Sequence, residues 1–273
     1  MDGGVACFAD EGLRAPLCVS VDISEDDAVL AMEFVDGTPA ENWEIDTYAE
    51  AARCLGAAQG RIALGDGIPD LQWLSRGFLR AYSTEKPAIW GLLDDDRAWD
   101  QPVVARNFPT ALRSVANELH AQRDRLYSVL ESLPRTFCHL DFWTKNLIQT
   151  DDGFVLLDWA FVGDGALGED IGNLVPDAAF DFFVEPGQLP QLRDATLDAY
   201  VGGLRDAGWH GDPRIIELAM AASAVKYDWL TPLMLELASA TEHHRYGGDT
   251  VTDADEFFAK RGAALLELSL IHI

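Results

Sequence analysis

The sequence predicts an α+β fold, with short strands near the start and in the centre of the chain and long helices elsewhere. Apolar runs at 16–21 and 28–34 flank an acidic turn at 24–27, a pattern typical of two strands joined by a hairpin. Leucines recur every seven residues from Leu112 to Leu133, the spacing of one helix face. Helical patterns also fill most of the chain after residue 187.

The remaining elements follow from turn residues and periodicity. Asp36-Gly37 ends the second strand, Pro134 ends the long helix, and Asp152-Gly153 between two apolar runs predicts a hairpin. The stretch 60–108 is predicted to be irregular. The predicted helices are 46–59, 110–133, 189–207, 213–237 and 254–268, and the predicted hairpin strands are 147–149 and 154–159.

Size and composition limit the classes of protein to consider. The 273 residues suit one large domain or a large domain with a smaller partner, and 48% hydrophobic residues can bury a sizeable core. No apolar run is long enough to span a bilayer, and the first residues lack the pattern of a signal peptide. Four cysteines without CxxC spacing predict free thiols in a reducing compartment. We therefore expect a cytoplasmic protein that does not interact with membranes.

The charge balance is strongly acidic, with 46 acids, 20 bases and a formal charge of −26. A protein that binds a phosphate backbone needs a basic surface, so nucleic acid is not an expected partner. Two interpretations remain open. The acids form a solvated surface that keeps the protein soluble, which their even distribution favours, or they attract a cationic substrate.

The residues that point to chemistry are His139 and Asp141, followed by Asn146 and then by Asp158. Asp141 and Asn146 can lie at the two ends of one short loop, and the predicted hairpin returns Asp158 to the same place. Phosphoryl transfer to a hydroxyl requires a carboxylate that orients the hydroxyl and accepts its proton, and oxygen ligands that hold Mg²⁺. The alternative is that Asp141 and Asn146 only cap turns.

This HxDxxxxN pattern, followed after a hairpin by two apolar residues and Asp-Trp, resembles the catalytic and metal loops of aminoglycoside and related small-molecule phosphotransferases. The resemblance implies a protein-kinase-like fold that uses ATP and Mg²⁺. It makes Asp141 the catalytic base and Asn146 and Asp158 the metal ligands. His139, the second residue assigned to the catalytic loop, would hold that loop by hydrogen bonds.

Neighbouring residues favour the small-molecule branch of this fold. Leu140 stands where protein kinases have Arg, and Trp159-Ala160 stands where they have Phe-Gly. Residues 168–174 resemble the family segment that follows the metal Asp, and the resemblance implies that Asp170 braces the catalytic loop. These motifs cover 137–174, and a weaker resemblance extends back to residue 16 and forward through the helices.

Residues 32–37 resemble the hinge between the two lobes of the family. The resemblance implies that backbone groups near Glu33 and Val35 bind the adenine edge; the alternative is an ordinary strand and turn. Only 32 residues precede Glu33, and the first lysine is Lys86, so the Gly-rich loop and the strand Lys of the family have no counterpart. Glu11 is the candidate for the helix Glu. A truncated sequence is favoured over a natural degenerate kinase.

We therefore predict an incomplete β-rich N-lobe with the hinge at 1–37 and a mainly α-helical catalytic lobe at 38–273. The last six residues are interpreted either as a non-native tail or as the end of a docked helix. The predicted function is ATP-dependent transfer of the γ-phosphate to a hydroxyl of a small molecule, an aminoglycoside-like or other amine or sugar alcohol. The alternative is a catalytically dead ligand-binding or scaffold module.

Three weaker signals lie outside these motifs. Asp177, Asp181 and Glu185 lie four residues apart, which on a helix indicates either a face for a cationic substrate or a solvated face. Tyr227 and Trp229 are interpreted as core or pocket wall. The pair at 243–244 has two histidines but no second ligand pair, so we do not expect a metal there.

Overall fold

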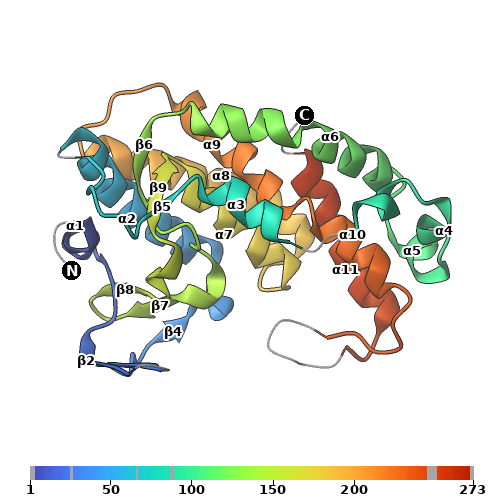
Figure 1. The fold of residues 1–273 in the computed structure, drawn as a ribbon, viewed down its shortest axis with the longest axis horizontal. Helices are drawn as coiled ribbons and strands as arrows, with labels where there is room; N and C mark the ends of the chain where they lie inside the picture. The colour runs from blue at the N-terminus through green and yellow to red at the C-terminus, as the bar shows by residue number, and fades with distance from the viewer. Residues whose placement is uncertain (1–3, 25–26, 66, 87–88, 245–250, 271–273) are drawn as a thin grey trace.

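The computed structural model describes residues 4–24, 27–65, 67–86, 89–244 and 251–270 and has an elongated α+β architecture. Small sheets lie at one end and a helical region at the other (Figure 1). The helices are α1 Gly4–Asp10, α2 Ile45–Leu64, α3 Phe78–Glu85, α4 Asp96–Trp99, α5 Pro102–Asn107, α6 Leu112–Glu131, α7 Glu169–Phe180, α8 Leu189–Asp206, α9 Pro213–Ser223, α10 Leu230–Leu237 and α11 Ala254–Leu270. The strands are β1 Leu13–Arg14, β2 Cys18–Ile23, β3 Ala28–Met32, β4 Thr38–Pro39, β5 Ser75–Arg76, β6 Arg135–Cys138, β7 Leu147–Thr150, β8 Gly153–Leu156 and β9 Gly163–Ala166.

A four-stranded sheet in the order β1-β8-β7-β4 carries the predicted hairpin. β7 and β8 pair antiparallel, with Leu147 opposite Leu156, which confirms the turn predicted from Asp152-Gly153. β1 pairs parallel to β8 and β4 pairs antiparallel to β7. Gly37 allows this last contact, because a Cβ there would lie 2.3 Å from the Gln149 carbonyl oxygen. The pairing of β4 therefore holds the preceding segment 33–35 near β7, the strand that follows Asn146.

A second sheet, in the order β5-β9-β6, was not predicted from the sequence. Its strands are two to four residues long, and the glycines at both odd positions of β9 are poor strand formers. Gly163 is needed for close packing, because a Cβ there would lie 2.1 Å from the Ser75 carbonyl oxygen. β6 leads directly into the predicted catalytic loop, so this sheet sets the position of that loop.

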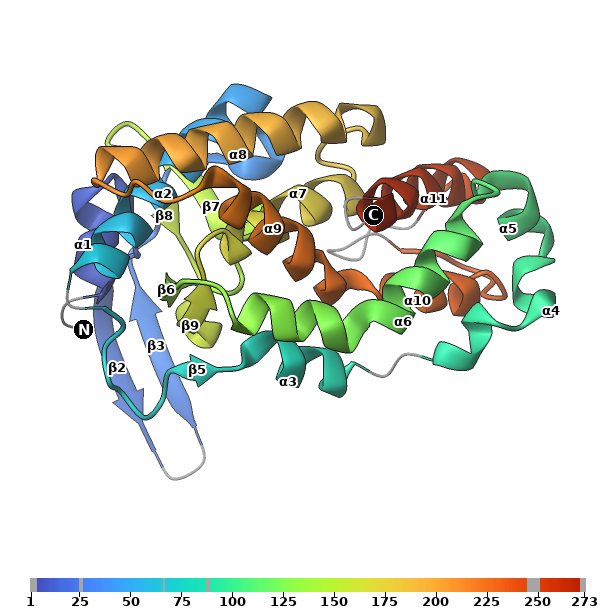
Figure 2. The same cartoon turned by 90° about the horizontal axis from the view of Figure 1, so that it is seen from above.

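Helices α2 and α8 pack closely beside the first sheet (Figure 2). Glycines at the interface permit this approach: a Cβ on Gly56 would lie 2.2 Å from the Tyr200 carbonyl oxygen, and one on Gly203 would lie 2.0 Å from that of Arg53. α2 is longer than the helix predicted at 46–59. Its buried face joins the main core through Tyr48, which has no exposed surface.

Two sequence-based predictions about the helices were wrong. The stretch 60–108 is not wholly irregular, because it contains α3, α4 and α5. The helix predicted at 213–237 is broken into α9, a 3₁₀ turn at Ala224–Tyr227, and α10. The break directs Lys226 and Tyr227 into the protein, where both are buried. No helix in the described ranges has the length and apolar character needed to cross a bilayer.

The predicted N-terminal hairpin is present, with β2 and β3 pairing antiparallel and Val21 opposite Leu30. It projects from the body of the molecule (Figure 2), and every residue of both strands is exposed. The preceding helix α1, in contrast, packs on the core, because Phe8 is fully buried and its ring contacts those of Phe137 and Trp159. The division of the chain at residue 37 remains a prediction. The end of the predicted tail, 271–273, lies outside the described residues.

Candidate functional site

The loop after β6 is held in an unusual backbone conformation by Asp170. Leu140 has a φ of +65°, the left-handed region that non-glycine residues rarely adopt. The fully buried Asp170 carboxylate accepts hydrogen bonds from the backbone N–H of His139 at 2.9 Å and of Leu140 at 2.7 Å. Gln59 of α2 donates a third bond at 2.7 Å. The prediction that Asp170 braces the loop is confirmed.

Asp141 is the next residue of this loop, and Asn146 orients its side chain. The Asn146 Nδ2 donates to both the Asp141 carbonyl oxygen and Asp141 Oδ2, at 3.0 Å each. Burial raises the pKa of Asp141, and nearby Asp158 raises it further, while Lys226 and the Asn146 bond oppose the shift. The side chain is 23% exposed. The sequence-predicted pair is therefore in contact, with Asp158 in the same electrostatic environment.

His139 joins the loop to the segment that carries Asp158. Its Nε2 donates to the Leu157 carbonyl oxygen at 2.9 Å, and its ring lies edge-on to Trp159 with centroids 5.0 Å apart. Burial lowers the pKa of His139 to about 3, so the imidazole is neutral at physiological pH. These contacts agree with the expected loop-holding position and give this ring no direct access to a reacting hydroxyl, because it is fully buried.

Asp158 and Asn146 present oxygen atoms suited to a hard divalent cation. Asp158 is exposed, has a φ of +53°, and accepts only a 3.3 Å bond from the Ala160 N–H among the described residues. Because Asn146 donates through Nδ2, its Oδ1 is left without a partner in the described part of the chain. The Leu157 N–H donates to the Asn146 carbonyl oxygen at 2.8 Å, which keeps the two segments together. This donor set fits Mg²⁺.

In the predicted hinge, the Glu33 side chain is hydrogen-bonded within the protein, whereas two backbone groups have no partner among the described residues. The Glu33 carboxylate accepts from Arg14 and from the Leu17 N–H at 3.0 Å, and the Glu33 N–H donates to the Leu17 carbonyl oxygen at 3.0 Å. Neither the Glu33 carbonyl oxygen nor the Val35 N–H has a hydrogen-bond partner within the described ranges. One acceptor and one donor are thus free there, as recognition of a purine edge requires.

Other sequence candidates have internal partners. Glu11 pairs with Arg61 of α2 at 2.5 Å. Asp181 pairs with Arg261 at 3.0 Å and Glu185 pairs with Lys260 at 2.8 Å. The helix α7 ends at Phe180, so the prediction that these acids share one helix face with Asp177 was wrong.

Two further predictions concern a metal site and the cysteines. Among the described residues, no group of three or more His, Cys, Asp or Glu side chains is placed to hold a metal, and the expectation for 243–244 remains a prediction. All four cysteines are free, as predicted.

Sequence reasoning missed Lys226, which lies 85 positions beyond Asp141. Its Nζ lies 3.6 Å from Asp141 Oδ1 and 3.4 Å from the Leu140 carbonyl oxygen. Beside it, Asp177 of α7 accepts a 2.7 Å bond from the Tyr227 hydroxyl, and burial raises the pKa of Asp177 to about 7. The only sequence signal was a lysine within an otherwise apolar helical stretch.

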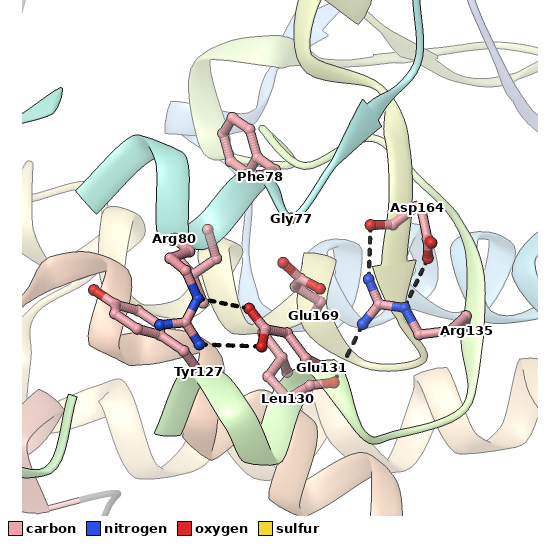
Figure 3. A pocket seen from close by; sticks show the side chains of 10 residues that line it. Gly77, Phe78, Arg80, Tyr127, Leu130, Glu131, Arg135, Asp164 and Glu169 are labelled. Carbon is pink, nitrogen blue, oxygen red and sulfur yellow. Dashed lines mark hydrogen bonds and ion pairs between the residues drawn. The ribbon is translucent and has the colours of Figure 1, made fainter. Parts of the chain in front are cut away.

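A small pocket is lined by two ion pairs, Arg80–Glu131 and Arg135–Asp164 (Figure 3). Glu169 also lines it, and burial raises the pKa of this carboxyl to about 7. None of Asp141, Asn146 and Asp158 contributes to its lining. We therefore place the candidate active site at Asp141 and not in this pocket.

Comparison with known proteins identifies the family and the fold of the chain. A family model described as "Phosphotransferase enzyme family" matches residues 6–211. At the level of sequence, no curated protein is a significant match. A choline/ethanolamine kinase family protein from Mesorhizobium loti has a similar structure, with a TM-score of 0.53, 16% identity, and coverage of 97% of this chain and 76% of that chain.

Two further solved structures share the fold. An amicoumacin kinase in complex with AMP-PNP, Ca²⁺ and its ligand has a TM-score of 0.53 and 11% identity, covering 97% of this chain and 75% of that one. A choline kinase from Cryptosporidium parvum Iowa II has a TM-score of 0.50 and 15% identity, with the same two coverages. At these identities the likeness establishes the protein-kinase-like fold.

Proposed function

The chain belongs to the phosphotransferase enzyme family and is a small-molecule kinase, and we propose that it transfers the γ-phosphate of ATP to a hydroxyl group of a small molecule with the help of Mg²⁺. The proposal rests mainly on one observation. Asp141 is held by Asn146 at 3.0 Å, on a loop braced by Asp170, with Asp158 close enough to shift its pKa.

In the proposed reaction, the acceptor hydroxyl donates a hydrogen bond to the Asp141 carboxylate. This contact orients the hydroxyl oxygen toward the γ-phosphorus, and Asp141 accepts the proton as the new O–P bond forms and the bond to the β-phosphate oxygen breaks. The products are ADP and a phosphate monoester. Asn146 occupies Asp141 Oδ2, so the hydroxyl would approach Oδ1, beside which Lys226 Nζ lies at 3.6 Å.

The metal would be held by Asn146 Oδ1 and the Asp158 carboxylate, and the triphosphate would complete its coordination. Bound there, Mg²⁺ supplies neutralisation of the charge on the phosphate oxygens. The Glu33 carbonyl oxygen and the Val35 N–H would bind the adenine edge. β4 pairs with β7 immediately after these residues, which supports placing the adenine site next to the metal site.

The test is a comparison of Asp141→Asn with the wild-type chain. We expect the variant to bind ATP–Mg²⁺ in calorimetry as the wild type does, because the amide keeps the shape of the site. Turnover of a phosphorylated acceptor, followed by ³¹P NMR, should fall by at least about 100-fold. Asp206→Asn, an exposed side chain paired only with Arg53, is the matched control and should retain activity.

Either of two results would overturn the proposal. Near wild-type turnover by Asp141→Asn would remove Asp141 from the reaction. Absence of Mg²⁺-dependent ATP binding by the wild-type protein would favour the catalytically dead binding or scaffold module.

A further inference from the structure

We propose that Lys86 and Lys226 together bind an anionic group, a carboxylate or a phosphate, of the acceptor that presents its hydroxyl to Asp141. The inference rests on the proposed function, since it names the acceptor class of the same site. It also departs from the cationic acceptor that the overall charge of −26 suggested.

The distribution of lysines motivates this proposal. The chain has four lysines, Lys86, Lys145, Lys226 and Lys260. Lys145 pairs with Glu41 at 2.5 Å, and Lys260 pairs with Glu185 at 2.8 Å. Lys226 has only a long ion pair of 3.6 Å with Asp141, Lys86 has no ion pair in the described part of the chain, and both lie on the same tyrosine ring. Half of the lysines therefore converge on one place beside the candidate base.

Lys226 is buried but poorly satisfied. Its side chain is 4% exposed, yet its contacts with oxygen are long, 3.4 Å to the Leu140 carbonyl and 3.6 Å to Asp141 Oδ1. Its remaining neighbours are aromatic faces, with Nζ 5.0 Å from the Tyr82 centroid and 5.6 Å from that of Phe78. An ammonium group has three donors, and a buried one that lacks strong acceptors is costly. An incoming anion would supply the missing acceptor.

Lys86, at the end of α3, approaches the same ring. Its Nζ lies 4.2 Å from the Tyr82 centroid and 4.8 Å from that of Trp229. Burial lowers the pKa of Lys86 and the charge of Lys226 lowers it further, whereas the carboxylates of Asp141, Glu85 and Asp177 oppose the shift. Two ammonium groups against one ring can both donate to an incoming carboxylate or phosphate.

The acidic groups nearby do not fill this role. Asp141 is bonded to Asn146, and Asp177 accepts from the Tyr227 hydroxyl at 2.7 Å. Neither comes within 3.5 Å of a lysine nitrogen among the described residues. The ammonium group of Lys226 therefore lies against the candidate base and Lys86 lies on the same ring as Lys226, although the protein as a whole is acidic. A small hydroxy acid or a phosphorylated alcohol fits this arrangement.

The experiment compares four probes of similar size that differ in charge: glycerate, glycerol 3-phosphate, glycerol and ethanolamine. Binding to the full chain is measured by ligand-observed NMR titration in the absence of nucleotide. We expect saturable millimolar binding of an anionic probe and none of ethanolamine or glycerol. The two anionic probes distinguish a carboxylate site from a phosphate site.

Charge-neutral variants identify the residues responsible. Lys86→Gln is partly exposed and should fold, and it should weaken binding of the anionic probe by about tenfold. Lys226→Gln should do the same if it folds. Lys260→Gln removes a lysine that pairs with Glu185, far from the loop, and should leave binding unchanged.

The proposal is overturned if neither anion binds in the millimolar range, if ethanolamine binds better than both, or if Lys86→Gln binds the anionic probe as the wild type does. These outcomes are separable from failure of the proposed function. An anion site that depends on Lys86 in a protein without Mg²⁺-dependent ATP binding would refute the kinase activity alone. Asp141-dependent transfer to ethanolamine would refute the anion site alone.

Discussion

Replacing Asp170 by asparagine tests whether one buried carboxylate holds the catalytic loop. Oδ2 accepts from two donors, the His139 N–H and Gln59, whereas Oδ1 accepts only from the Leu140 N–H. We therefore expect the amide nitrogen of the asparagine to occupy the Oδ1 position, because only one hydrogen bond is lost there. The Leu140 N–H, on a residue with a φ of +65°, then faces another donor.

The magnitude follows from this single lost bond. Losing a charge-assisted hydrogen bond and leaving a buried N–H unpaired costs about 3 kcal/mol. Burial raises the pKa of Asp170 to about 6, so its ionised form is itself disfavoured, and a neutral amide offsets part of the loss. A net decrease of about 2 kcal/mol in the free energy of unfolding corresponds to a melting temperature lower by about 4–8 °C.

The assay combines thermal melting with amide hydrogen exchange. Exchange at His139 and Leu140 should accelerate more than exchange in α2 and α8, because the loop loses its support before the core does. Asp206→Asn, whose side chain is 53% exposed, is the control and should melt with the wild type. If Asp170→Asn also melts with the wild type and its loop amides exchange unchanged, the reasoning about the brace is wrong.

Two other predictions concern stability. Burial raises the folded-state pKa of Glu169 and Asp177 to about 7 and that of Asp170 to about 6, so the stability that each contributes at low pH is lost as pH rises through these values. The lowered pKa of His139 acts in the opposite direction for one proton, so these four groups together should make the melting temperature fall as pH rises from about 5 to 7 in a buffer series. A Glu169→Gln variant should reduce this fall, and an unchanged profile would contradict this assignment. Gly56→Ala should lower the melting temperature by at least 5 °C, about 2 kcal/mol or more, because its Cβ meets the Tyr200 backbone, whereas Gly91→Ala, with no atom within 4 Å, should not. Equal melting of the two glycine variants would show that the α2–α8 contact adjusts freely.

Much of the site was predictable because its residues are close in sequence. His139, Asp141 and Asn146 lie on one loop, and a hairpin of two four-residue strands with an Asp-Gly turn returns Asp158 to it. Local rules of turns and phosphoryl-transfer chemistry were therefore enough to select these residues. The hairpin at β2–β3 and the long helix α6 were predictable for the same reason, since their periodicity lies within single segments.

The errors occurred where local patterns carry little information. The strands β5, β6 and β9 are too short to show alternation, and their pairing depends on glycine contacts between distant segments. The broken helix after residue 213 contains no proline at the break, so its apolar pattern continued unbroken in the sequence. Short elements and bends of this kind are decided by packing.

By itself, the sequence determined the reaction type, because the candidate base and metal ligands share one local motif. Only the tertiary structure decided what surrounds that motif. Gln59 reaches Asp170 across 111 positions, and Lys226 reaches the Leu140 carbonyl across 86. No periodicity or turn rule connects residues so far apart, because burial of the helices that carry them brings these side chains together. The acceptor class therefore depends on contacts that exist only in the folded chain.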